Sequence, residues 1–269
     1  MRIACFQGPE LAGTPAANLA GLERLAAEAA GRGADLLVCP ELWLTGYAIG
    51  AAAVASLAEP LDGASVEKAG RVAAAAGLAL VFGLPERDRA TVYNTVVALG
   101  RDGELLASYR KTHLFGVVDR EQFSPGQKQA APFEVAGLKA ALLICYDVEF
   151  PENVRMAALG GADLVVVPTA LMHPFDVVAR IVVPARAFEN QIFLVYANRC
   201  GREGAFDYCG SSCVVGPDGR DLARAGEGEE LILADVDPAA LAASRRLNTH
   251  LEDRRPGLYV GIAGGGRPT

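Results

Sequence analysis

The sequence contains no long hydrophobic run and no block of like charges. Hydrophobic residues make up 51% of its 269 residues, but charged residues and glycines interrupt each apolar stretch before it reaches membrane-spanning length. No apolar segment with a small-residue cleavage site follows Met1, so we expect a cytoplasmic protein without a membrane partner. The formal net charge of −7 argues against a nucleic acid as a partner.

Cysteine and histidine are both scarce, and their positions exclude some kinds of site. None of the three histidines lies in a segment of cysteine-protease type, which argues against a histidine base. Among the six scattered cysteines, Cys200, Cys209 and Cys213 lack both paired CxxC spacing and a nearby histidine. We therefore expect buried free thiols at these positions, and no metal site.

Linker-like segments and internal repeats are absent as well, which predicts a single domain over residues 1–269. Apolar segments of strand length alternate with segments of helical periodicity, and some strand pairs are joined by short turns, so we expect a mixed α/β sheet covered by helices. The expected strands span 3–7, 35–39, 78–82, 91–99, 104–109, 133–135, 138–144, 163–168, 192–197, 209–215 and 230–236. The expected helices span 15–31, 65–77, 151–159, 177–190 and 238–246, with loops over 48–60 and 117–126 and a polar tail over 248–269.

One apolar run ends at a cysteine in a way that favours a nucleophile. The run 141–144 has the composition of a strand buried on both faces, and Cys145 follows it directly. Pro151 then opens a helix, because proline at the first helical position costs no hydrogen bond. A side chain at the carboxyl end of a sheet strand projects into a crevice. Cys145 is therefore a candidate nucleophile, and it needs an activating group because only the thiolate attacks.

Two residues of opposite charge follow other predicted strands. Glu41 follows a buried strand through Pro40, and Lys111 follows a hairpin strand. A carboxylate and an ammonium in apolar surroundings are costly unless they pair. Taken singly, Cys145 also fits a packed thiol, Glu41 a helix cap and Lys111 a solvated surface lysine. All three follow predicted strands, however, and this shared position favours a joint role. In such a cluster Glu41 takes the thiol proton and Lys111 stabilises an oxyanion, which is acyl transfer through a thioester.

Three blocks of sequence stand in order around these residues. They are Cys-Pro-Glu at 39–41 with Thr-Gly-Tyr at 45–47, Tyr-Arg-Lys-Thr-His-Leu-Phe at 109–115, and Leu-Ile-Cys-Tyr-Asp at 143–147 with Phe-Pro-Glu at 150–152. These blocks resemble the signature blocks of the nitrilase superfamily of carbon–nitrogen hydrolases, and the resemblance covers nearly the whole chain. It implies a four-layer αββα sandwich, no metal or organic cofactor, and a homodimer or higher homo-oligomer.

The resemblance also implies roles for individual residues. Glu41 is the general base, Lys111 the cation that stabilises the transition state and Cys145 the nucleophile. The backbone N–H of Tyr146 is the second oxyanion donor.

Two positions carry an alternative each. Many members of the superfamily have a further glutamate before a Phe-x-Pro-Gly turn; this chain has Asp119 and Glu121 there, and we favour Asp119. In the tail 248–269, the segment 254–259 is a candidate subunit contact, and packing on its own domain is the alternative.

The fuller strings around the blocks look most like bacterial aliphatic amidases of the 5-aminopentanamidase type. Such an enzyme hydrolyses a small aliphatic primary amide to the carboxylic acid and ammonia. Glu149, just beyond the nucleophile, is a candidate partner for an amino group on the substrate. Pairing of Glu149 with Arg155 or Arg186 is the structural alternative.

Three other functions fit the same residues. A nitrilase uses them on a nitrile, and an N-carbamoyl amino acid hydrolase adds a basic group for the substrate carboxylate, which Arg186 or Arg199 supplies. A catalytically inactive scaffold or a thiol redox protein is the alternative outside this chemistry. The three intact chemical residues argue against inactivity.

Overall fold

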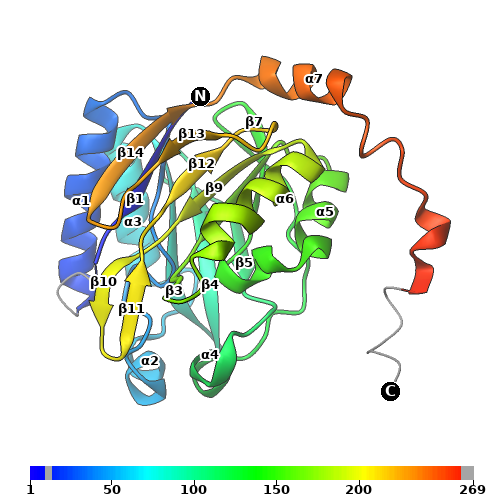
Figure 1. Ribbon diagram of the computed structural model, residues 1–269. Helices are drawn as coiled ribbons and strands as arrows, with labels where there is room; N and C mark the ends of the chain where they lie inside the picture. The colour runs from blue at the N-terminus through cyan, green and yellow to red at the C-terminus, as the bar shows by residue number, and fades with distance from the viewer. Residues whose placement is uncertain (10–13, 262–269) are drawn as a thin grey trace.

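Two six-stranded mixed sheets lie face to face in the computed structural model, which describes residues 1–9 and 14–261 (Figure 1). In each sheet the three central strands are paired in parallel, and every pairing outside them is antiparallel. The first sheet is ordered β14 (Glu230–Asp235), β1 (Arg2–Gln7), β2 (Leu36–Val38), β3 (Ala79–Asp88), β4 (Thr91–Leu99) and β5 (Leu105–Arg110). The second is ordered β13 (Asp221–Arg224), β12 (Cys213–Val215), β9 (Phe193–Ala197), β8 (Leu164–Pro168), β7 (Leu138–Leu142) and β6 (Phe133–Val135).

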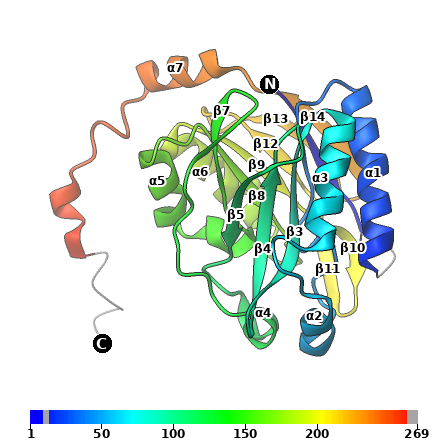
Figure 2. The same ribbon diagram turned by 180° about the vertical axis from the view of Figure 1, so that it is seen from behind.

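Helices cover the outer face of each sheet (Figures 1 and 2). The first sheet carries α1 (Pro15–Gly31) and α3 (Ala64–Ala76), and the second carries α5 (Pro151–Leu159) and α6 (Val183–Asn190). α1 begins where the Thr14 side chain accepts a hydrogen bond from the Ala17 N–H at 3.3 Å, and its buried side chains recur at helical spacing. The four-layer αββα sandwich implied by the resemblance is thereby confirmed.

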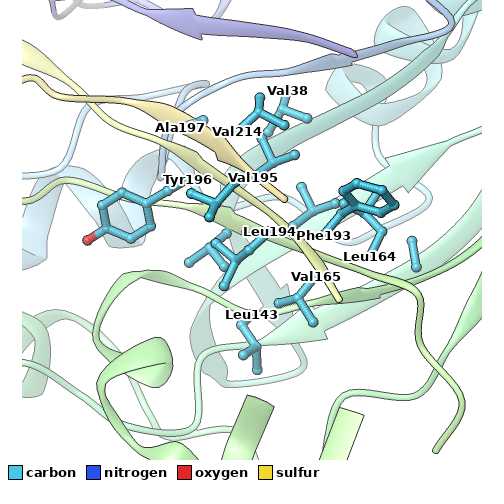
Figure 3. Packing of buried hydrophobic residues seen from close by; sticks show 14 of the residues in the cluster. Val38, Leu143, Leu164, Val165, Phe193, Leu194, Val195, Tyr196, Ala197 and Val214 are labelled. Carbon is cyan, nitrogen blue, oxygen red and sulfur yellow. The ribbon is translucent and has the colours of Figure 1, made fainter. Parts of the chain in front are cut away.

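The main core fills the space between the two sheets. Every residue of β8 and β9 is buried, which explains why both segments are apolar throughout and do not alternate. Figure 3 shows Leu164, Val165 and Leu194 from these strands in one cluster with Val38 of the first sheet. A smaller core lies between the first sheet and its helices α1 and α3.

The sequence-based prediction missed three elements, which lie together at the lower end of the molecule in Figure 1. The expected loops contain two short helices, α2 (Ala51–Leu57) and α4 (Gly116–Gln122). A hairpin of β10 (Cys200–Glu203) and β11 (Phe206–Cys209) lies there as well. The expected strand 209–215 was wrong, because Gly210 and Ser211 both adopt positive φ and separate β11 from β12.

The C-terminal segment leaves the body of the protein. α7 (Pro238–Leu247) is attached to the body, since its Leu241 is buried in the main core and Gln191, just after α6, donates to the Ser244 oxygen at 3.0 Å. The short 3₁₀ helix η3 (Pro256–Leu258) lies farther out, beside α5 (Figures 1 and 2). Leu247 is 91% exposed, and Leu258 and Val260 are also largely exposed. Over the described ranges 1–9 and 14–261, the structure contains no helix with the length and apolarity needed to cross a membrane.

Candidate active site

A buried ammonium lies between two buried carboxylates at the lower end of the first sheet. Lys111 follows β5, Glu41 lies in the turn after β2, and Asp119 lies on α4. The Nζ atom of Lys111 is 2.7 Å from Glu41 Oε1 and 2.7 Å from Asp119 Oδ2, and all three side chains have no exposed surface. The structure therefore brings the predicted Glu–Lys pair together and adds Asp119. Glu121 is exposed on the same helix.

Hydrogen bonds hold one oxygen of each carboxylate and leave the other free. Asn94 Nδ2 donates to Glu41 Oε1 at 2.7 Å, and the Phe115 N–H donates to Asp119 Oδ2 at 2.8 Å. Glu41 Oε2 and Asp119 Oδ1 are buried and have no hydrogen-bond partner among the described residues. Buried polar atoms in native proteins are normally paired, so these two oxygens are open positions for a thiol proton or a bound molecule.

Asn94 is a member of the site that the sequence analysis missed. It lies in the middle of β4, and its backbone oxygen accepts the Lys111 N–H at 2.9 Å. A fully buried amide in an otherwise apolar strand requires a hydrogen-bond partner. That requirement was the only signal in the sequence, and it does not identify the partner.

The cluster holds one more acid than base, and this excess governs its electrostatics. Burial raises the pKa of the Glu41 carboxyl; Lys111 lowers this pKa but only in part, and Asp119 raises it further. Burial by itself lowers the pKa of the Lys111 ammonium, but Glu41 and Asp119 outweigh burial and raise it well above its ordinary value. Lys111 therefore stays charged, while Glu41 accepts a proton more readily than an exposed glutamate does.

Cys145 lies at a sharp turn between β7 and a 3₁₀ helix, η1 (Cys145–Glu149), of which it is the first residue. Its φ is +44°, a strained value for a residue with a side chain, and such strain is concentrated at functional sites. Burial raises the pKa of the Cys145 thiol, Glu41 raises it further, and Lys111 with Thr169 and Ala170 lowers it in part. The thiol is therefore protonated at neutral pH and requires a base in order to react.

Asp147 connects the nucleophile turn to the segment that carries Lys111. Its fully buried carboxylate accepts hydrogen bonds from the Tyr109 hydroxyl at 3.0 Å, the Thr112 hydroxyl at 2.8 Å and the His113 N–H at 2.9 Å. It also accepts the Ile144 N–H at 3.3 Å, directly before the cysteine. The ring of His113 also contacts this carboxylate, with Nδ1 2.8 Å from Asp147 Oδ1. His113 therefore helps to hold the segment after Lys111, and the sequence analysis did not expect it to be the base.

A small pocket opens onto Cys145. The cavity volume is about 10 Å³, and the empty space around it, which includes open solvent, is about 270 Å³. Tyr146 and Glu149, two of the residues expected to bind substrate, line it beside Cys145, and the third, Asp119, does not. The remaining walls are apolar or aromatic: Tyr47, Phe115, Ala170, Leu171, Met172 and Phe175. A site of this size and lining fits a small, largely apolar group.

Glu149 is not held by either arginine proposed as its structural partner. Within the described residues neither Arg155 nor Arg186 forms an ion pair with it. Arg186 instead donates to the backbone oxygens of Val148 at 3.0 Å and Glu149 at 2.8 Å. Burial raises the pKa of the Glu149 carboxyl, and Lys111 and Arg186 lower it only in part.

The cysteines away from the pocket have no evident chemical role. All six cysteines are buried and free, including Cys200, Cys209 and Cys213. Within residues 1–9 and 14–261, no group of three or more histidine, cysteine or acidic side chains is placed to hold a metal ion.

Comparison with known proteins relates this geometry to a family. Residues 2–246 match the family described as carbon–nitrogen hydrolase. The chain belongs to this family of hydrolases. Carbon–nitrogen hydrolases act on non-peptide carbon–nitrogen bonds, so the chain is an enzyme of that class.

Relatives of this carbon–nitrogen hydrolase include proteins named as amidases. The chain is 48% identical to a hydrolase in the pqqF 5′ region of Pseudomonas protegens, over 96% of this chain and 90% of that one. It is 39% identical to an (R)-stereoselective amidase of Pseudomonas sp., over 82% and 80% of the two chains.

Solved structures of an amidase from Nesterenkonia sp. AN1 have the same fold. A double mutant of that amidase in complex with acrylamide superposes with a TM-score of 0.85 at 36% identity, covering 97% of each chain. Other structures of that protein contain butyramide, or the acetamide moiety of fluoroacetamide added covalently at its active-site cysteine.

The buried ion cluster leads to a prediction about stability. Replacing Lys111 by Met leaves Glu41 and Asp119 facing each other in the interior without a counter-charge. We expect the free energy of unfolding at pH 7 to fall by about 3–5 kcal/mol, measured by urea denaturation. Lys128→Met, at an exposed lysine, is the control and should change it by less than about 0.5 kcal/mol. Equal effects of the two substitutions would contradict the buried cluster.

Proposed function

We propose that this carbon–nitrogen hydrolase is an amidase that converts a small aliphatic primary amide to the carboxylic acid and ammonia through a cysteine thioester. The observation that carries this proposal is the Lys111 ammonium, held between Glu41 and Asp119 beside the thiol of Cys145. A base, a cation and a nucleophile in one water-poor site are what acyl transfer requires.

The first half of the reaction forms the thioester. Glu41 takes the Cys145 thiol proton at Oε2 as the sulfur attacks the amide carbon, and the carbonyl oxygen becomes an oxyanion. Lys111 Nζ and the Tyr146 backbone N–H stabilise this oxyanion. The intermediate then collapses: the carbon–nitrogen bond breaks, Glu41 returns the proton to nitrogen, and ammonia leaves. The free, unpartnered Oε2 and the raised pKa of Glu41 support its role as the proton carrier.

The second half consumes water. Glu41 takes a proton from a water molecule as its oxygen attacks the thioester carbon. The carbon–sulfur bond then breaks, the sulfur recovers its proton from Glu41, and the carboxylic acid is released. Asp119 keeps Lys111 in place and offers its free Oδ1 to the amide nitrogen of the substrate. In this scheme the carboxyl of Asp119 binds the substrate. Asp119 is thus the further acid before the Phe-x-Pro-Gly turn, for which the sequence favours it over Glu121.

The dimensions of the pocket support a short acyl chain. The space beside Cys145 is small and its walls are mostly apolar, which favours a short acyl chain over a long one. Acrylamide and butyramide, the amides bound to the Nesterenkonia amidase, have short acyl chains.

A panel of four compounds tests the reaction class by ammonia release: propionamide, 5-aminovaleramide, propionitrile and an N-carbamoyl amino acid. We expect ammonia from the amides, and a loss of at least about 10³-fold in kcat with Cys145→Ala. Cys213→Ala, which removes a buried thiol of β12 that does not line the pocket, should retain activity.

Each other result of the panel identifies another function. Ammonia from propionitrile alone would make the enzyme a nitrilase, and ammonia from no compound at high enzyme concentration would favour an inactive scaffold or a redox protein. The N-carbamoyl amino acid is the least favoured substrate, because both candidate arginines are engaged by backbone oxygens. Arg186 binds those of Val148 and Glu149, and Arg199 is buried.

Glu149 supports a finer proposal, that the preferred amide carries an amino group. Its carboxylate lines the pocket, and no described residue forms an ion pair with it. An ammonium group on the substrate would supply the missing counter-charge in a partly desolvated setting. This is the substrate class of the 5-aminopentanamidase type.

Exchange of Glu149 for Gln tests the preference for an amine. We expect kcat/KM for 5-aminovaleramide to fall about tenfold, the size of one charge-assisted hydrogen bond, because the counter-charge is removed. The value for valeramide, which has the same chain length and no amine, should not fall. Glu152→Gln, at an exposed acid on α5, is the matched control. An unchanged ratio between the two amides would remove the proposal.

The exposed tail supports a homodimer. Four large apolar side chains are exposed on or beside α5 and α6, of which Phe188 contacts His250 of the tail at a ring-centroid distance of 5.2 Å: Met156, Leu159, Ile181 and Phe188. The tail carries its own exposed side chains, Leu258, Tyr259 and Val260. We propose that a second copy packs on this face and that each tail lies against the partner.

Light scattering tests the dimer. We expect the full chain to have twice the monomer mass of 28.1 kDa at micromolar concentration, because the apolar face and tail are otherwise exposed to water. Deletion of residues 248–269 and, separately, Ile181→Asp should each shift the equilibrium toward monomer. Leu105→Asp, at an exposed leucine of β5, is the control. A full chain that is monomeric at all concentrations would exclude the dimer.

A further inference from the structure

Arg199 is a fully buried cation that lies close to the backbone of Glu41. It stands between β9 and β10, and only 1% of its surface is exposed. We infer that Arg199 is a positioning residue which fixes the general base Glu41 through its main chain. This inference rests on the proposed role of Glu41 and extends it to a residue that does not contact the substrate.

The guanidinium group donates to two successive carbonyl oxygens. Arg199 Nε and Nη2 donate to the Glu41 oxygen at 3.2 and 3.0 Å, and Nη2 also donates to the Leu42 oxygen at 2.9 Å. Within the described part of the chain, no carboxylate forms an ion pair with Arg199. Burying a guanidinium costs free energy unless hydrogen bonds compensate. Its hydrogen bonds to the backbone oxygens of this turn indicate that Arg199 holds the turn in place.

The turn that Arg199 holds is strained. Leu42 has a φ of +47°, in the left-handed region that disfavours residues with a side chain. On the opposite side Gly83 of β3 presses against the turn: a Cβ atom at this position would lie 2.5 Å from the Leu42 backbone nitrogen. The Leu44 N–H also donates to the Gly83 oxygen at 3.1 Å.

The main chain of Glu41 is fixed at both ends. Its N–H donates to the Thr169 oxygen at 3.3 Å, and its carbonyl oxygen is held by Arg199. With both ends held, the Cα–Cβ bond of Glu41 keeps its direction, and the side chain bonds to Lys111 and Asn94. Proton transfer requires the base within hydrogen-bond reach, and a displacement of about 1 Å costs ~100-fold in rate.

Arg199 does not bind the carboxylate of an N-carbamoyl amino acid, the role that the sequence left open for it. A residue that binds a substrate carboxylate must present its guanidinium to the pocket, and Arg199 does not line the pocket beside Cys145. Its Nε and Nη2 atoms donate to backbone oxygens of Glu41 and Leu42. Its contribution to the reaction is therefore geometric.

The experiment compares Arg199→Lys with a matched control in the full-length enzyme. Arg224→Lys is the control, since Arg224 is a partly buried arginine that binds Asp221 and a backbone oxygen outside the site. We expect Arg199→Lys to lower kcat for propionamide by ~100-fold, with KM changed by less than about threefold. The rate at which iodoacetamide alkylates Cys145 at pH 7 should fall toward the rate of Glu41→Gln. Arg224→Lys should change neither quantity.

A second variant keeps the test decisive if Arg199→Lys does not fold. Gly83→Ala leaves Arg199 intact but pushes on the Leu42 nitrogen from the other side, so it should give the same loss of kcat and of alkylation rate. Wild-type kcat and alkylation rate in either folded variant would overturn the inference, as would a loss that only follows the fraction of folded protein. If the wild-type enzyme releases no ammonia from any amide, the proposed function fails, and the alkylation rates still decide the role of Arg199.

Discussion

The structure around the site depends on one interaction, the contact of the Lys111 ammonium with the carboxylates of Glu41 and Asp119. Removing each of these charges from water costs several kcal/mol, and only their mutual attraction at short distance offsets that cost. The three residues come from the end of β2, the end of β5 and α4. These segments cannot separate without leaving a buried charge unpaired, so the charge cluster holds the lower end of the first sheet together.

Burial, reinforced by the Glu41 carboxylate, sets the resting state of the nucleophile. Because burial and the nearby carboxylate raise the pKa of Cys145, the sulfur is a neutral thiol until a substrate arrives. A neutral thiol in a narrow apolar pocket reacts slowly with oxidants and stray electrophiles. In the proposed mechanism the raised pKa of Glu41 compensates, since it lets the carboxylate take the proton during the attack. The same cluster therefore protects the thiol at rest and activates it in the reaction.

The fold was predictable from local sequence, as was the position of Glu41, Lys111 and Cys145 just after strands, but the hydrogen-bond partners of these residues were not. The apolar runs of β8 and β9 predict buried strands. Glu41 and Cys145 follow the mostly buried strands β2 and β7, and Lys111 follows the largely exposed strand β5. The helices α2 and α4 are too short for a periodic pattern. Asp119 and Glu121 differ by two positions, which places them on different faces of a helix, so only the observed register of α4 separates them. Asn94 and Arg199 bind Glu41 across 53 and 158 residues, a distance over which no local pattern acts.

One wall of the pocket is held in place by a part of the chain that carries none of the chemical residues. Tyr47 lies in a turn, and the buried carboxylate of Glu203 in β10 accepts its N–H and that of Ala48, both at 2.8 Å. The hydroxyl of Tyr208 in β11 in turn donates to Glu203 at 2.5 Å. The β10–β11 hairpin thereby positions one wall of the acyl pocket without contacting the base, the ammonium or the nucleophile. Substitutions in this hairpin therefore act on the site through Tyr47. Because the Lys111 ammonium lies 5.8 Å from the centre of the Tyr47 ring, they change the fit of the amide and the surroundings of the ammonium together.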